Sequence, residues 1–271
     1  MFRSLSLVFF SLFTLSYASA LELRDPLTQG SLVRAKVEPG SQVTLNGQPV
    51  RADAEGNLVF GFGRDAELEH QVVVTSASGE ATEYPLTLTE RTYRIQRIEG
   101  IAKRIMEPKP EDIARARQDS AQVKKARAVD SDRVDWQQTF IWPLSGPITG
   151  VYGSQRVYNG VPKRPHFGVD VAAPTGTRVV APADGVITLA VPDMFYSGGT
   201  LIIDHGYGVS SSFLHLSRLL VKPGDEVRQG QEVAEVGATG RVTGPHLDWR
   251  INWFGQRLDP QLLVPEMAEK P

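Results

Sequence analysis

The sequence predicts a mainly β protein with a small N-terminal β-sandwich, a charged, partly helical linker and a β-rich C-terminal domain. Three observations lead to this prediction. The 25 glycines and 18 prolines favour turn-rich structure over long helices. Short apolar runs alternate with turn residues in both halves of the chain, and a strongly charged stretch with one helical segment separates these halves.

Composition limits the chemistry that is available. The chain has 271 residues and a formal net charge of −2, which argues against sequence-independent binding of nucleic acid. It contains no cysteine, so disulfides, thiolate zinc sites, iron–sulfur clusters and cysteine nucleophiles are excluded. Catalysis or metal binding must therefore use histidine, carboxylate, serine or lysine, and the chain contains only five histidines.

Residues 1–20 have the features of a secretory signal peptide. Arg3 precedes an apolar stretch from Leu5 to Ala18, and Ala18-Ser19-Ala20 has the small-x-small pattern of a cleavage site. The apolar stretch is shorter than the roughly 20 residues of a membrane span, although an uncleaved anchor is the alternative. We expect cleavage near Ala20, no stable membrane span afterwards and, because the exported chain lacks cysteine, a location in the bacterial periplasm.

Residues 21–90 are expected to form the small β-sandwich domain. The sequence Asn46-Gly47 between two apolar runs is typical of a hairpin turn. The domain has a single histidine and no clustered carboxylates, which favours a structural or binding role. The predicted strands are Ser31–Val37, Gln42–Leu45, Leu58–Phe62, His70–Thr75 and Tyr84–Leu88.

Residues 91–138 are expected to be a charged, partly helical linker. Pro110-Glu111-Asp112 is typical of a helix start, with acidic residues in the first turn, and the helix is predicted to run over Ile113–Val129. Glu111 and Arg115 have the spacing of an i,i+4 ion pair. The apolar face is poor, so a helix that packs loosely on a neighbouring domain is preferred over one that binds membranes.

Residues 139–262 are expected to form the second folded domain, followed by a C-terminal tail over 263–271. Four of the five histidines lie in this part of the chain. Glycine-rich turns separate the strands predicted here, which are Val179–Pro192, Thr200–Asp204, Ser210–Ser217, Glu226–Val236 and Leu247–Trp253.

Two short motifs place histidines near other polar groups. On a regular strand, His166 and Asp170 would lie about 13 Å apart, so Gly168 is expected to mark a bulge or bend that brings them together. In the second motif, strand alternation predicts that Phe213, His215 and Ser217 share one face. The remaining domain histidine, His205, stands at a strand end and is expected to be structural.

The third motif alternates cleanly along a predicted strand. His246, Asp248 and Arg250 are expected on one face, while the apolar residues between them pack on the other. A polar face backed by apolar residues is typical of a metal site on a sheet. Three nitrogen or oxygen ligands plus a water form a catalytic zinc site, in which the metal acidifies the water and polarises a carbonyl.

These motifs resemble those of the M23 metallopeptidases, the lysostaphin/LytM-type peptidoglycan endopeptidases. The resemblance covers about 100 residues and implies a mostly antiparallel β fold with a groove and one zinc ion. The matching stretches, in order, are His166-x-x-x-Asp170, Ala181-Pro182-Ala183-Asp184-Gly185-Val186, Leu214-His215-Leu216-Ser217, Lys222-Pro223-Gly224-Asp225-x-Val227 and Thr239-Gly240 followed by Gly244-Pro245-His246-Leu247.

The resemblance assigns roles to five residues. His166 and Asp170 correspond to metal ligands, and His215 and His246 to catalytic histidines, one as general base and the other stabilising charge on the carbonyl oxygen. At the third ligand position the family has histidine, whereas this chain has Asp248. A carboxylate binds zinc at a similar distance, although the less positive site is also compatible with another divalent metal.

Two further residues are candidates for binding substrate. Tyr158 lies where the family often has a tyrosine that stabilises the oxyanion, and Arg250 continues the polar face of the third motif and is able to meet a substrate carboxylate. A solvated strand residue is an equal alternative for Arg250.

The predicted function is that of a zinc-dependent metalloendopeptidase that hydrolyses peptide cross-links of peptidoglycan. The alternative is a non-hydrolytic LytM-type domain that regulates a cell-wall amidase, so amidases and divisome components join peptidoglycan as expected partners. The stretches around Asp184 and Lys222 also resemble a biotinyl or lipoyl carrier barrel. However, no lysine lies between Lys163 and Lys222 to carry a cofactor, which leaves only shared architecture.

Overall fold

The computed structural model describes residues 21–100 and 109–267. The predicted signal peptide therefore lies outside the described residues, as do the last four residues of the predicted tail. Among the described helices, none combines the length and apolar character needed to cross a bilayer.

The N-terminal part consists of two small sheets that share one apolar cluster. The first sheet has the order β1 (Glu22–Leu23), β2 (Leu32–Lys36), β5 (Asn57–Gly61). The second has the order β4 (Gln48–Val50), β3 (Gln42–Leu45), β6 (Glu69–Thr75), β7 (Ala81–Thr87). The five predicted strands are confirmed to within three residues at each end, and the structure adds β1 and β4. Asn46 and Gly47 both have positive φ, at 48° and 76°, as a tight hairpin turn requires.

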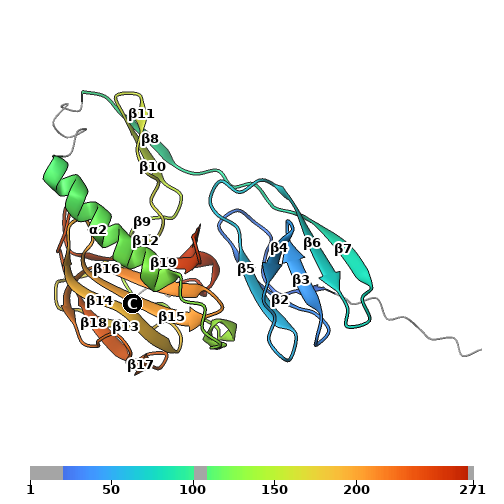
Figure 1. Cartoon of the computed structure of the whole chain (residues 1–271). Helices are drawn as coiled ribbons and strands as arrows, with labels where there is room; N and C mark the ends of the chain where they lie inside the picture. Colours follow the sequence, from blue (N-terminus) through green and yellow to red (C-terminus); the bar gives the residue numbers. More distant parts are fainter. Residues whose placement is uncertain (1–20, 101–108, 268–271) are drawn as a thin grey trace, which may run out of the picture.

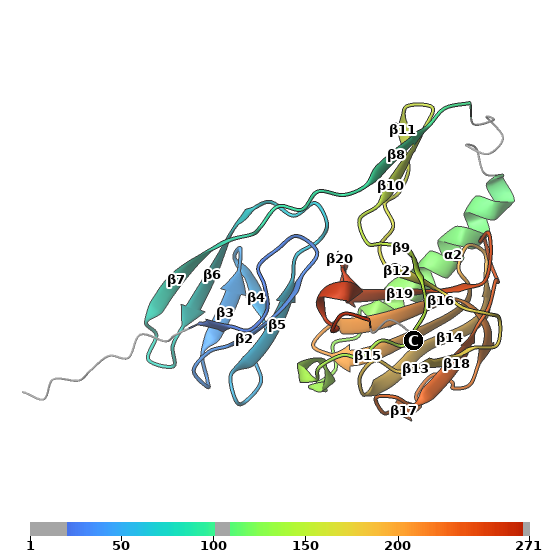
Figure 2. The same ribbon diagram turned by 180° about the vertical axis from the view of Figure 1, so that it is seen from behind.

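The linker leaves the N-terminal part along an extended ribbon. Strand β8 (Ile95–Ile98) pairs in parallel with β10 (Gln155–Tyr158), which in turn forms a hairpin with β11 (Val161–Pro162). Figures 1 and 2 show this ribbon projecting from the C-terminal domain. The sequence did not predict β8, because its pairing partner lies some 60 residues further along the chain.

Helix α2 (Pro110–Arg127) agrees with the predicted linker helix and crosses one face of the C-terminal sheet (Figure 1). Val123 and Ala126 pack against residues of two strands of that sheet. The predicted pair between Glu111 and Arg115 is wrong. Arg115 instead binds Asp193 at 2.7 Å, because docking the helix on the sheet offers it a partner from another element.

The C-terminal domain is built on a sheet of ten described strands in which every pair is antiparallel. Its main path has the order β17 (Glu226–Val227), β14 (Gly185–Met194), β15 (Gly198–Gly206), β16 (Val209–Leu219), β19 (His246–Trp253), β12 (Val169–Ala172), β9 (Ile148–Gly150). Off this path, β13 (Arg178–Val180) pairs with β18 (Glu232–Val236), β18 also pairs with β16, and β20 (Gln256–Leu258) pairs with β19.

Two predicted strands of this domain are each divided in the structure. The segment from Val179 to Pro192 forms β13 and β14, and Glu226 to Val236 forms β17 and β18. In the second case the break is a turn in which Gly230 has a φ of 80°. Short 3₁₀ helices lie at Asp135–Gln137 and Pro260–Leu262.

Apolar packing joins the two halves of the chain. The main cluster of the C-terminal domain includes the fully buried Trp136 and Trp249, and Leu32 and Val59 of the N-terminal sheets belong to the same cluster. Arg91 also binds Asp259 at 2.8 Å. The N-terminal part is thus packed directly on the domain that carries the three histidine motifs.

Candidate metal centre

The register of two neighbouring strands brings two carboxylates together. Asp170 on β12 lies directly opposite Asp248 on β19, so both side chains share one face of the sheet. His166 precedes β12 in a loop that pairs with residues 153–154: its N–H donates to the Ser154 carbonyl and its carbonyl accepts from the Gly153 N–H, both at 2.8 Å. The sequence expectation that these groups converge is confirmed.

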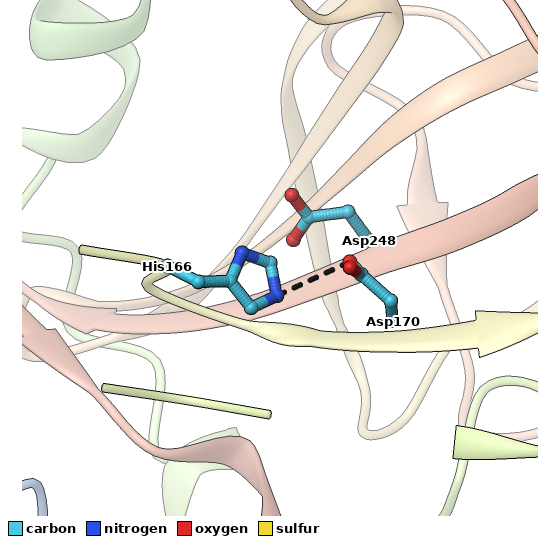
Figure 3. A group of neighbouring side chains, drawn as sticks. All are labelled: His166, Asp170 and Asp248. Atoms are coloured by element: carbon cyan, nitrogen blue, oxygen red, sulfur yellow. Dashed lines mark ion pairs between the residues drawn. The ribbon is translucent and has the colours of Figure 1, made fainter. Parts of the chain in front are cut away.

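The three side chains offer ligand atoms that all lie within 4.8 Å of one another (Figure 3). Nε2 of His166 is 3.2 Å from Oδ1 of Asp170. Both of these atoms are buried, and apart from this mutual contact neither has a hydrogen-bond partner among the described residues. Buried polar atoms of this kind are costly unless another group satisfies them. One imidazole and two carboxylates form a donor set suited to zinc or another divalent metal, so the residues fit such an ion.

Glycine at two positions allows this convergence. A methyl group at Gly168 would lie 2.5 Å from both Oδ1 of Asp248 and the Trp249 carbonyl oxygen, and one at Gly150 would overlap the Asp170 carboxylate. Gly168 was expected to mark a bend, and it does lie at a bend just before β12. Its second role, the close approach of the loop to β19, is visible only in the folded chain.

Arg250 is the partner of Asp248. Its Nε donates to Oδ1 at 2.9 Å and its Nη2 donates to Oδ2 at 2.5 Å, which is a two-pronged pairing. Asp248 is only 2% exposed, and burial by itself would raise its pKa, but the charge and hydrogen bonds of Arg250 lower this pKa to about 2. The carboxylate is thus kept ionised, which is the form that binds a metal. The sequence placed both residues on one face but did not predict their pairing.

His215 and His246 lie beside the ligand group with their ring centroids 4.9 Å apart. Nδ1 of His215 donates to the Thr239 carbonyl at 3.0 Å, and Nδ1 of His246 donates to the Gly244 carbonyl at 2.8 Å. Since a carbonyl only accepts, each ring carries its proton on Nδ1 when neutral, which leaves Nε2 free as a base.

The backbone at His215 is irregular. Its φ of 67° is rare for a residue with a side chain, and the pairing register of β16 with β15 shifts between Phe213 and Leu216. The expectation that Phe213 and His215 share a face is therefore wrong. The irregularity leaves Phe213 buried in the core, whereas His215 lines the groove together with Leu214.

Neighbouring charges and burial shift the pKa values of His166 and His215 in opposite directions. For His166, burial disfavours the charged ring, but the carboxylates of Asp170 and Asp248 outweigh it and raise the pKa. For His215, burial dominates and lowers the pKa, so its ring is neutral near pH 7. A neutral imidazole is the form required of a general base.

The remaining sequence candidates are widely spread. Tyr158 on β10 lines the same groove of about 1290 Å³, and its hydroxyl is 3.5 Å from Nη1 of Arg156. His205 is fully buried: its Nδ1 donates to the Asp184 carbonyl at 2.6 Å, and Ser211 lies 2.8 Å from its Nε2. These contacts agree with the structural role expected for His205.

Residues 164–260 match the model of Peptidase family M23. The chain is 44% identical over 87 residues to the peptidoglycan DD-endopeptidase ShyA of Vibrio cholerae. This alignment covers 32% of this chain and 20% of ShyA. It is 42% identical over 109 residues to the DD-carboxypeptidase/endopeptidase Mpg of Neisseria meningitidis, covering 39% of this chain and 25% of Mpg. The chain thus spans about a fifth to a quarter of the length of these curated relatives.

A solved structure of a putative M23 peptidase from Pseudomonas aeruginosa is similar over more of the chain. It has a TM-score of 0.68 and 27% identity, covering 88% of this chain and 95% of that one. The antiparallel sheet, the groove and the histidine–carboxylate group are the features that the resemblance to metallopeptidases implied. Residues 164–260 thus match peptidase family M23, and the sequence resemblance of this part of the chain to that family is confirmed.

Proposed function

We propose that the protein is a zinc-dependent endopeptidase that hydrolyses peptide cross-links of bacterial peptidoglycan. The observation that carries the proposal is the convergence of His166, Asp170 and Asp248 within 4.8 Å, beside two histidines whose Nε2 atoms are unprotonated when the rings are neutral. The names of relatives such as ShyA support peptidoglycan as the substrate and a peptide bond as the target.

The roles follow from the surroundings of each side chain. His166, Asp170 and Asp248 would hold the ion, and Arg250 would orient the Asp248 carboxylate. When bound, a divalent metal supplies a Lewis acid that acidifies water and polarises the scissile carbonyl. Of the two histidines, His215 has its pKa lowered by burial and is assigned as the base, while His246 is positioned to stabilise charge on the carbonyl oxygen.

The site of action proposed here is the periplasm, with the signal peptide removed near Ala20. Peptidoglycan lies on that side of the cytoplasmic membrane, and the relatives named for peptidoglycan hydrolysis are consistent with it. One relative, 33% identical over 132 residues, is the cell division protein DipM of Caulobacter vibrioides. This likeness supports divisome components or amidases as partners to be tested.

The test is a digestion of purified peptidoglycan by the mature chain, followed by separation of the muropeptides. We expect loss of cross-linked dimers with zinc, no loss with a chelator, and recovery when zinc is restored. His215→Gln should retain the metal and lose cleavage, whereas the exposed Arg218→Gln serves as a control for charge loss away from the groove.

Three outcomes would contradict the proposal. If the protein binds no divalent metal, or if cleavage survives Asp170→Ala, the metal centre has no role in hydrolysis. If the zinc-loaded protein leaves cross-links intact but accelerates a cell-wall amidase, the regulatory alternative is correct.

A further inference from the structure

The groove that contains the metal centre is strongly cationic. Nine arginine and lysine side chains line it, against two acidic ones, Asp119 and Asp170. This excess is local, because the whole chain has a formal net charge of −2. A groove lined with one sign of charge concentrates ligands of the opposite sign. The groove is therefore suited to an anionic ligand.

Two of these arginines meet at one neutral acceptor. Arg127, in the last turn of α2, donates from Nη1 to Oδ1 of Asn252 at 3.1 Å, and Arg257 on β20 donates from Nη1 to the same oxygen at 2.7 Å. Over the described part of the chain, neither guanidinium has a carboxylate oxygen within 4.0 Å. Burial lowers the pKa of Arg257 to about 10, which indicates that its charge is uncompensated.

The surroundings hold this acceptor in place. Asn252 is fully buried, and its Nδ2 donates to Oγ of Ser212 at 3.3 Å, so that Oδ1 faces the two arginines. Ser210 lies opposite Asn252 across the strands and is 2% exposed, and its Oγ has no hydrogen-bond partner in the part of the chain that the structure describes. Two cations thus share one neutral oxygen beside a strand position with an unsatisfied hydroxyl, and no carboxylate of the described residues pairs with either cation.

We propose that Arg127 and Arg257 form a carboxylate-binding subsite that holds a free carboxylate of the peptide substrate. Asn252 lies four residues beyond Asp248 on the same strand face, which corresponds to about 13 Å. An extended peptide covers that distance with about four residues. The subsite would set the position of the chain relative to the metal centre, and this inference rests on the proposed function.

Helix α2 completes the subsite. Its Arg127 reaches the sheet because the helix is docked by the Arg115–Asp193 pair and by a hydrogen bond from the Phe195 N–H to Asp119 at 2.8 Å. The linker helix therefore contributes directly to the substrate groove of the adjacent domain.

The experiment measures binding separately from cleavage. Soluble cross-linked muropeptides are compared with the same muropeptides after their carboxylates have been converted to amides, and both are titrated calorimetrically into the full mature chain in the presence of a chelator. We expect amidation to weaken binding to the wild type by about tenfold or more, as for the loss of a charge-assisted hydrogen-bond pair. The double variant Arg127→Gln/Arg257→Gln should bind both forms equally, whereas Arg218→Gln should discriminate like the wild type.

Several results would overturn the subsite. One is a double variant that still binds free muropeptides more tightly than amidated ones, although its melting temperature and circular dichroism match those of the wild type. Should that variant not fold, the single variant Arg127→Gln serves instead: it removes one of the two charges, and a loss of affinity on amidation as large as that of the wild type contradicts the proposal. Inorganic phosphate that binds Arg127 and Arg257 as tightly as the muropeptide does would assign the site to a free anion.

Failure of the subsite and failure of the proposed function are distinguishable. Discrimination without cleavage in zinc would support the subsite and refute the peptidase. Cleavage in zinc with equal rates on free and amidated muropeptides would support the peptidase and refute the subsite.

Discussion

Replacing Gly168 by alanine tests whether close approach of the loop to β19 builds the metal centre. The added methyl carbon would lie 2.5 Å from Oδ1 of Asp248, whereas ordinary contact begins near 3.4 Å, so the loop and strand must separate by about 0.9 Å. Zinc–ligand distances tolerate about 0.2 Å. His166 and Asp248 therefore cannot both keep their best distances to a common ion, and we expect zinc affinity to fall by about tenfold to a hundredfold. The strain should also lower the free energy of unfolding by about 1–3 kcal/mol.

The assay is a zinc titration against a competing chelator, with thermal unfolding recorded with and without zinc. The matched control is Gly255→Ala, where a methyl group meets no atom within 4 Å and should leave both quantities unchanged. If Gly168→Ala binds zinc with wild-type affinity, the ligand group does not depend on this contact and the reasoning is refuted.

Three further predictions concern charged or titratable groups, two of them buried and one exposed. Arg250→Gln leaves the buried Asp248 carboxylate unpaired and should lower the unfolding free energy of the zinc-free protein by about 3–5 kcal/mol. Zinc should then raise the melting temperature of the variant more than that of the wild type. An equal rise in both proteins would contradict the pairing argument. Burial lowers the pKa of His205 from 6.5 to about 4, so between these pH values the unfolded chain binds a proton that the folded chain does not. The free energy of unfolding should therefore fall by about 2–3 kcal/mol as the pH drops from 6.5 towards 4. In urea titrations, the unfolding free energy of His205→Gln should depend less steeply on pH over this range. Arg115→Gln removes an exposed ion pair with Asp193 and should change the unfolding free energy by less than about 1 kcal/mol. A larger change measured by calorimetry would contradict this and would show that the pair stabilises the fold.

The predictable part of the site lies within single segments. Period-two alternation in β19 places His246, Asp248 and Arg250 on one face, and the His166/Asp170 spacing requires a bend that Gly168 allows. The prediction for β16 was wrong because alternation holds only while the strand is regular. The positive φ of His215 lies where the register of β16 with β15 shifts, and no local sequence pattern indicates it.

The predictable part of the fold is similarly local. Strands flanked by glycine turns and the helix that begins at Pro110 were predicted near their observed positions. Strand β8 and the true partner of Arg115 were not, since each depends on residues distant in sequence.

By itself, the amino-acid sequence determined that this is a mainly β chain whose only available metal ligands are histidine and carboxylate, and it identified the segments that bear them. These properties follow from residue chemistry and from the short periods of strands and turns. Only the tertiary structure decided that Arg250 pairs with Asp248, that the ring of His215 lies beside that of His246, and that Arg127 of the linker helix shares a hydrogen-bond acceptor with Arg257. The second and third of these arrangements depend on sheet register and helix docking, which sequence spacing does not encode. Arg250 and Asp248 share a strand face that alternation predicts, so in their case the fold decided only the conformations of the two side chains.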